Sequence, residues 1–188
     1  SSAASDVYQR QVLAVDAAMA ANADHWFVRE TIGMIRRTIA RLDVSSRSLF
    51  AIIDEGSCFA GSLFELALAA DRSYMLDIPE EEGTPPAIAL SDMNFGYLEM
   101  ANGKSRLAVR FSNDTDKLSA LKADTGTVYA PSDAEREGLI TYAPDDIDWD
   151  DEIRVAEEER TSLSPEALTG MEANLRFAGP ENLVTKVF

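Results

Sequence analysis

The 188-residue sequence has few groups that could bind metals or form cross-links. It contains one cysteine, Cys58, and one histidine, His25, so an internal disulfide is excluded and a reducing, cytoplasmic location is expected. No apolar run is long enough to span a membrane, and no signal peptide is recognisable. Basic residues are also scarce, with 17 Lys and Arg against 33 Asp and Glu. The net charge of −16 argues against nucleic acid and anionic membranes as partners.

What is present is typical of a globular domain of ordinary size. Apolar residues make up 46% of the chain and charged residues 27%, enough apolar material for a sizeable core. Short apolar runs bounded by polar residues predict strands, and apolar residues at spacings of three and four predict helices. Repeated strand-then-helix units favour an α/β fold. The predicted strands are 49–53, 73–76, 88–90, 128–129 and 139–142; the predicted helices are 7–20, 26–42, 63–70, 100–110, 114–122, 132–138, 150–161 and 164–177.

The clearest helix lies at residues 26–42. Its apolar residues step by four, three, four and three, which places them on one continuous stripe; they are Val28, Ile32, Ile35, Ile39 and Leu42.

The segment 50–76 contains the most informative residue of the chain, Glu65. A short apolar strand leads to a turn at Gly61 and Ser62, and Glu65 follows in a helix that is otherwise apolar on nearly every side. A buried carboxylate is costly unless it is paired, hydrogen-bonded or neutralised. Two interpretations remain open for Glu65: it takes part in chemistry, or it forms a structural ion pair.

Three motifs in this order resemble the crotonase (enoyl-CoA hydratase/isomerase) superfamily. They are the small-residue turn followed by Glu-Leu-Ala and Asp at 61–71, the Ser-Asp-Met-Asn-Phe-Gly segment at 91–96, and the Ala-Glu-Arg-Glu-Gly-Leu-Ile segment at 134–140. The resemblance implies an α/β crotonase-like ββα spiral with C-terminal helices. It would divide the chain into a core at 1–160, part of a longer polypeptide, and a C-terminal helical segment at 161–188.

Phrases at 26–33, 42–50, 143–153 and 168–181 are similar to one branch, the benzoyl-CoA-dihydrodiol lyases. That branch resembles two crotonase-like halves in one polypeptide, and this chain resembles the second half. The resemblance implies hydrolytic ring opening of 2,3-epoxybenzoyl-CoA with loss of formate, in aerobic benzoate degradation. Coenzyme A would enter only as part of the acyl-CoA thioester substrate, with no other cofactor. The implied partner is a second copy, in a homo-oligomer, or a first crotonase-like half.

The same resemblance implies site residues. Glu65 and Asp92 would hold and activate water, with the assignment of acid and base open. The backbone N–H groups of Gly61 and Ser62 would form an oxyanion hole, since such donors stabilise developing negative charge. Two alternatives remain: a non-catalytic half used for packing and oligomerisation, or a generic enoyl-CoA hydratase. The expected substrate pocket contains Cys58, Phe95 and Tyr97.

Two further groups of residues have the composition of ligand sites. Lys104 and Arg106 are candidates for contacts to the coenzyme A phosphates. The acidic run at 146–157 has the spacing of a calcium loop, but Asp151 stands where that loop needs glycine, so no metal is expected.

Overall fold

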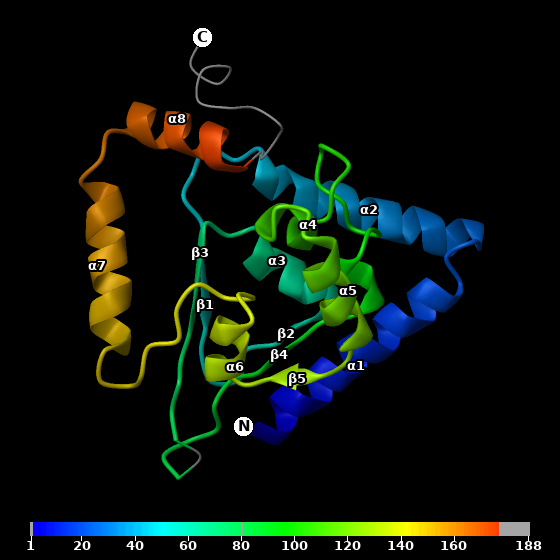
Figure 1. Ribbon diagram of the computed structural model, residues 1–188, viewed down its shortest axis with the longest axis horizontal. Helices are drawn as coiled ribbons and strands as arrows, with labels where there is room; N and C mark the ends of the chain where they lie inside the picture. Colours follow the sequence, from blue (N-terminus) through cyan, green and yellow to red (C-terminus); the bar gives the residue numbers. More distant parts are fainter. Residues whose placement is uncertain (1, 80, 177–188) are drawn as a thin grey trace.

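A computed structural model describes residues 2–79 and 81–176. Two long helices come first, α1 (Ser2–Ala21) and α2 (Trp26–Asp43), and form a hairpin at one edge of the molecule (Figure 1). The predicted stripe of α2 is confirmed, because Ile32 and Ile39 are buried and the other three residues pack in the same cluster. By contrast, the residues of α1 that are fully buried include two polar ones, Gln9 and Asp16.

The strands form two small sheets in the middle of the chain. β1 (Phe50–Ile53) and β3 (Arg72–Met75) are parallel, with Phe50 opposite Arg72. β2 (Phe59–Ala60) pairs in parallel with β4 (Ile88–Ala89), which pairs antiparallel with β5 (Val128–Tyr129). The crossover from β1 to β3 contains η1 (Gly61–Leu63) and α3 (Phe64–Leu68), so the turn and Glu65 lie between the two sheets.

Glycine-containing turns and short helices complete the core. η2 (Asp92–Asn94) follows β4, and the main apolar cluster is formed from both sheets and α3 through α6. The expected helix at 100–110 is too long: only Arg106–Arg110 is helical, because Gly103 adopts φ +73° and Ser105 caps the helix by accepting from the Ala108 amide. The remaining helices here are α4 (Arg106–Arg110), α5 (Thr115–Ala123) and α6 (Pro131–Arg136).

The predicted strand at 139–142 is wrong. This segment contributes a single bridge, from Tyr142 to Tyr74, since Gly138 turns the chain at φ +74°. The amides of Thr141 and Tyr142 then both donate to the Ser73 carbonyl. The segment therefore borders β3 without extending the sheet.

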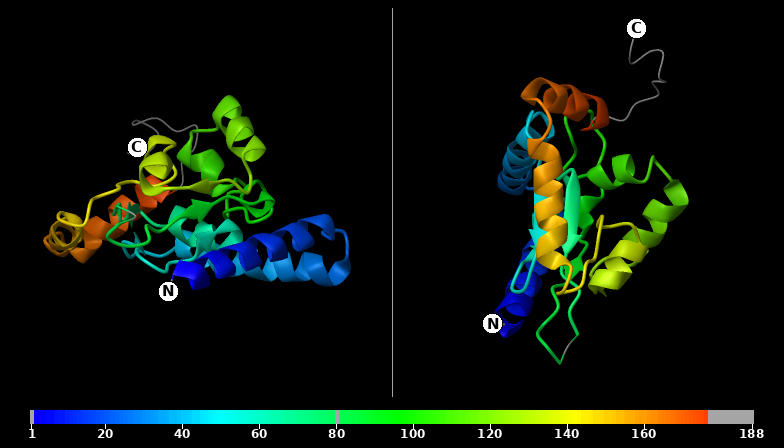
Figure 2. Two further views of the ribbon diagram at one scale, coloured as in Figure 1. Left: turned by 90° about the horizontal axis from the view of Figure 1, so that it is seen from below. Right: turned by 90° about the vertical axis from the view of Figure 1, so that its left-hand side faces the viewer.

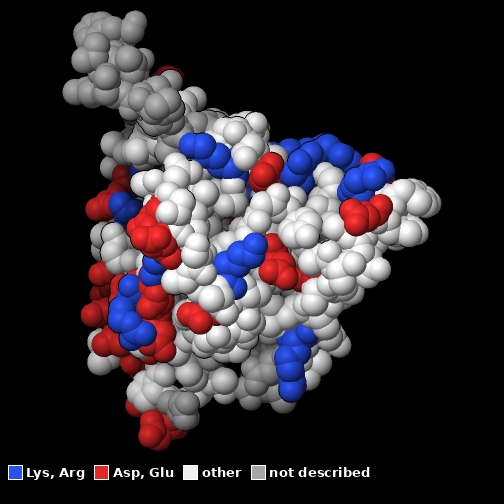
Figure 3. Space-filling view, turned by 45° about the vertical axis from the view of Figure 1, so that its right-hand side comes forward, with Lys and Arg blue, Asp and Glu red and all other residues white. Residues whose placement is uncertain are grey.

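Two helices end the described chain (Figures 1 and 2). α7 (Trp149–Thr161) lies at the opposite edge, and α8 (Pro165–Arg176) runs back towards the C-terminal end of α2, where Arg176 donates to the Leu42 carbonyl. Trp149 packs α7 against Tyr74 of β3. Acidic side chains gather over α7 and basic ones over α2 (Figure 3). The division at residue 160 stays a prediction, and residues 177–188 of the expected C-terminal segment lie outside the described residues. Within the described residues, no helix is both long and apolar enough to cross a bilayer.

Candidate active site

Glu65 lies at the centre of a buried ionic cluster. Its side chain, in the first turn of α3, is 1% exposed because the residues around it belong to the main core. Oε2 accepts a hydrogen bond from Arg106 Nη1 at 2.8 Å, and Oε1 accepts one from Asn94 Nδ2 at 2.8 Å. Both carboxylate oxygens are therefore held by donors from other elements, α4 and η2.

Arg106 connects this carboxylate to a second one, Asp43 at the end of α2. Its Nη2 and Nε donate to the two oxygens of Asp43 at 2.7 and 3.2 Å, and Nη1 also donates to the Leu98 carbonyl at 3.1 Å. Both residues are 3% exposed. The guanidinium is thus enclosed by acceptors and does not lie at the surface, where the expected phosphate contact would need it.

The cluster contains two carboxylates and one guanidinium. Burial raises the pKa of Glu65 above its ordinary value, and the charge of Asp43 acts in the same direction. Arg106 and the Asn94 hydrogen bond oppose that shift, because both favour the ionised form. Glu65 therefore retains its proton to a higher pH than an exposed glutamate does.

The turn before Glu65 is also occupied from within the chain. The Ser62 amide donates to Asp16 Oδ2 at 2.7 Å, and the Ser91 hydroxyl donates to the same oxygen at 2.6 Å. Gly61 adopts φ +50°, and a Cβ placed on it would lie 2.1 Å from Asp16 Oδ2. The Ser62 amide, the donor expected for an oxyanion hole, is hydrogen-bonded to a buried carboxylate of α1.

Asp92 is exposed, whereas Glu65 is buried. It is the first residue of η2 and is exposed, whereas Asn94, two residues later, is buried and makes the contact with Glu65. Ser91 caps η2 by accepting from the Met93 amide at 3.2 Å. The structure therefore brings Glu65 and Asn94 together, while the side chain of Asp92 faces solvent.

The three expected pocket residues are half-buried and fall into different surroundings. Phe95 packs on the main core, Tyr97 on the cluster beneath α2, and Cys58 lies between β1 and β2. Burial raises the pKa of the Cys58 thiol, which disfavours the thiolate. Phe95 and Tyr97 thus contribute to two apolar clusters.

A cavity of about 220 Å³ borders the ionic cluster on the side of α4 and α8. Its lining includes Asp43 and Arg106 but not Glu65, Ser62 or Asp92. The predicted catalytic and oxyanion-hole residues therefore do not line this cavity.

Four further residues complete the site: Asp16, Asp43, Asn94 and Arg106. The sequence did not predict a role in it for the first three, and it made Arg106 a candidate for phosphate contacts only. Asp43 follows Ile39 by four residues and so continues the buried stripe of α2. A carboxylate on the apolar face of a helix needs a partner, so Asp43 could have predicted a buried cation in contact with it. For Asn94 no comparable signal is present, because asparagine is common in turns.

Solved structures define the fold class of this chain. An enoyl-CoA hydratase from Bacillus anthracis matches 89% of this chain and 60% of its own, with a TM-score of 0.62 at 18% identity. An enoyl-CoA hydratase from Thermobifida fusca, described as putative and in complex with acetoacetyl-CoA, matches 85% of this chain and 58% of its own, with a TM-score of 0.58 at 14% identity. The chain has the crotonase fold.

One curated relative narrows the resemblance. The chain is 56% identical over 177 residues to benzoyl-CoA-dihydrodiol lyase from Aromatoleum evansii. The match covers 94% of this chain and 31% of that protein, so the chain spans about a third of the relative's length. No family model matches the sequence. The expected resemblance to this lyase is confirmed.

Proposed function

We propose that this chain is the non-catalytic, crotonase-fold part of an acyl-CoA enzyme of the benzoyl-CoA-dihydrodiol lyase type. The whole enzyme would catalyse hydrolytic ring opening of 2,3-epoxybenzoyl-CoA with loss of formate. Identity of 56% to the lyase over nearly the whole chain supports this type of enzyme. The part described here would serve as a scaffold that packs against the rest of the polypeptide.

The observation that supports the scaffold role most directly is that Glu65 is buried and both of its carboxylate oxygens are hydrogen-bonded to other side chains. A general base must reach the proton that it removes, directly or through one water. Here one oxygen of Glu65 faces Arg106 and the other faces Asn94, with the side chain 1% exposed. Arg106 is in turn fixed by both oxygens of Asp43. These contacts support the structural ion pair among the two interpretations of Glu65.

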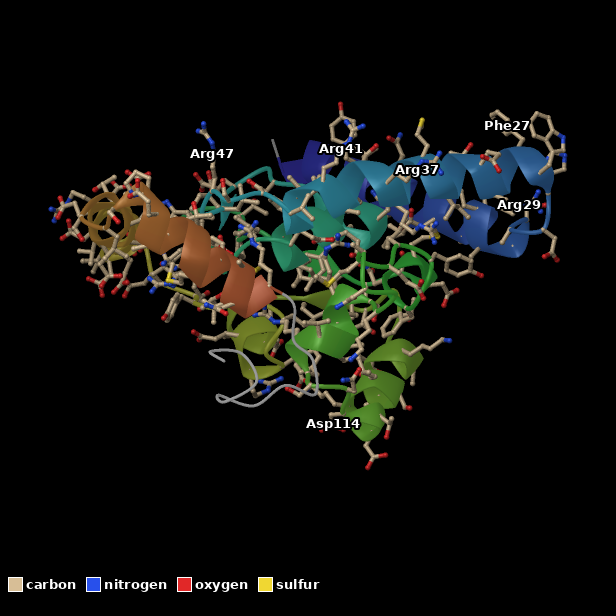
Figure 4. The ribbon with its side chains drawn as sticks, turned by 90° about the horizontal axis from the view of Figure 1, so that it is seen from above. Phe27, Arg29, Arg37, Arg41, Arg47 and Asp114 are labelled. Carbon is tan, nitrogen blue, oxygen red and sulfur yellow. The ribbon has the colours of Figure 1, made fainter. Side chains whose placement is uncertain are left out.

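A packing role also needs a surface, and α2 provides one. Figure 4 shows Phe27 and Arg41 on the side of α2 that faces away from the body, and Arg37 of the same helix is also exposed. Trp26 and Met34 are also exposed, so large apolar and basic side chains share this face. Exposed apolar patches with polar surroundings are typical of interaction sites. We assign this outward face of α2 to contact with the rest of the polypeptide.

The second candidate is a catalytic role for this chain, with Glu65 and Asp92 activating water. The raised pKa of Glu65 favours it, because a general acid must keep its proton near neutral pH. It stays a prediction, and it differs from the scaffold role in what Glu65 must do during turnover.

Turnover of the epoxide by the full-length enzyme carrying Glu65→Gln distinguishes the two. For a scaffold we expect kcat per folded protein within about twofold of wild type, since removal of a general acid or base typically costs about 10²–10⁴ in rate. A matched control is Glu157→Gln, which removes an exposed carboxylate from α7. A loss of kcat of two or more orders of magnitude in Glu65→Gln, with wild-type stability, would show that Glu65 is catalytic.

A further inference from the structure

Asp16 is the most deeply buried acid that the scaffold role leaves unexplained. It is 0% exposed, on the inner side of α1 where that helix crosses η1 and η2. Oδ2 accepts from both the Ser62 amide and the Ser91 hydroxyl, whereas Oδ1 has no hydrogen-bond partner among the described residues. A buried carboxylate oxygen without a partner is unfavourable, so some gain must retain Asp16.

The surroundings are shaped to fit one carboxylate oxygen. Gly61 adopts the left-handed region at φ +50°, and a Cβ there would lie 2.1 Å from Asp16 Oδ2 and 2.9 Å from Ser91 Oγ. Only glycine allows the chain to turn this closely around the oxygen. The Ser62 amide and the Ser91 hydroxyl then converge on the same point from two separate turns.

These features together describe an anion-binding site whose ligand is part of the chain. Hydrogen bonds from neutral donors to an ionised oxygen are shorter and stronger than bonds between neutral groups, and the distances of 2.7 and 2.6 Å agree with that. The Ser62 amide belongs to η1, the Ser91 hydroxyl to the N-cap of η2, and the acceptor to α1. One carboxylate oxygen therefore links three elements.

We propose that Asp16 is an internal ligand, whose carboxylate fills an anion-binding site built by the Ser62 amide and the Ser91 hydroxyl and closes it to external carboxylates and carbonyls. The inference deepens the proposed scaffold function, because a filled site cannot receive a substrate carbonyl. Shortening Asp16 removes the internal ligand and leaves both donors in place. The vacated site then has the size and chemistry for a small carboxylate.

The test is chemical rescue of Asp16→Ala in the full-length protein by formate, the smallest carboxylate. We expect Asp16→Ala to melt several degrees below wild type, and formate at tens of millimolar to recover a large part of that loss. Wild type should show no comparable response, and neither should Asp24→Ala, which removes an exposed acid just beyond α1. Chloride at equal ionic strength controls for salt.

Asp16→Asn provides the second arm. Its amide oxygen can accept from both donors but carries no charge, so we expect a melting temperature well above that of Asp16→Ala and below wild type, with no formate response. The inference is overturned if folded Asp16→Ala ignores formate, or if Asp16→Asn is as unstable as Asp16→Ala. The second outcome decides the matter even when Asp16→Ala does not fold. Turnover of Glu65→Gln is independent of formate rescue, so failure of the scaffold role and failure of this inference are distinguishable.

Discussion

Replacing Arg106 by methionine should strongly destabilise this chain. The guanidinium makes four hydrogen bonds, two to Asp43, one to Glu65 and one to the Leu98 carbonyl. Methionine keeps most of the side-chain volume but supplies no donor and no charge. Two carboxylates would then remain buried without a cation.

The size of the effect follows from the number of charges left unpaired. Breaking a buried ion pair by removing one partner costs about 3–5 kcal/mol. Without the guanidinium Glu65 can take up a proton, because burial already raises its pKa, so Asp43 is the charge left unpaired and we expect a loss of about 3–5 kcal/mol. Because a typical domain is stable by only about 5–15 kcal/mol, Arg106→Met should lose a large part of its stability at room temperature.

The assay is urea unfolding of the full-length protein, combined with hydrogen exchange of peptides that cover β1 and α3. These elements surround the cluster and should lose most protection. The comparison variant combines Arg106→Met with Asp43→Asn and Glu65→Gln, which removes all three charges. Neutral replacement of a whole buried pair is often tolerated, so the triple variant should recover most of the loss. The reasoning is refuted if Arg106→Met lies within about 1 kcal/mol of wild type, or if the triple variant is no better than the single.

Two further predictions concern Glu65 and the outward face of α2. Since burial raises the pKa of Glu65, its contribution to stability is complete below about pH 4.5 and is lost as the pH rises through the folded pKa. The advantage of wild type over Glu65→Gln in unfolding free energy should therefore shrink as the pH rises above about 4.5, and an advantage that grows with pH contradicts this. Phe27→Glu should lower the urea concentration at the midpoint of unfolding of the full-length protein if α2 packs on the remaining polypeptide. The control is Val128→Glu, at the same 60% exposure, which should leave that midpoint unchanged. Equal midpoints for the two variants would show that α2 is not in the interface.

Local sequence patterns were sufficient for most elements of the fold. The predicted strand at 49–53 and helix at 26–42 agree with β1 and α2 to within one residue, because the apolar spacing within each segment determines which face is buried. The helix at 100–110 was overestimated because its apolar residues continue across the turn at Gly103. Apolar residues alone do not show where a positive φ ends the regular structure.

The contacts of the site were less accessible from the sequence because they join distant positions. The need of Glu65 for a partner could be predicted from its apolar helix. Arg106, Asn94 and Asp43 could not be chosen as its neighbours, since Arg106 is 41 residues from Glu65 and 63 from Asp43, and Asn94 is 29 from Glu65. The sequence made Arg106 a candidate for contacts to the coenzyme A phosphates, but the fold buries its side chain.

One acid at one position in a fold can serve either chemistry or packing, and its neighbours determine which. Chemistry needs an oxygen of Glu65 left free for water; packing needs both oxygens held and the charge compensated. Here Asn94 and Arg106 hold both oxygens, and Asp16 accepts the hydrogen bond of the Ser62 amide, for which the sequence predicted a substrate oxygen. The contacts of Glu65 and the contact of Asp16 have the same consequence: the Glu65 carboxylate and the Ser62 amide are both hydrogen-bonded to other residues of the chain. A segment whose polar groups are satisfied internally can support the shape of a larger enzyme while the reaction takes place elsewhere in it.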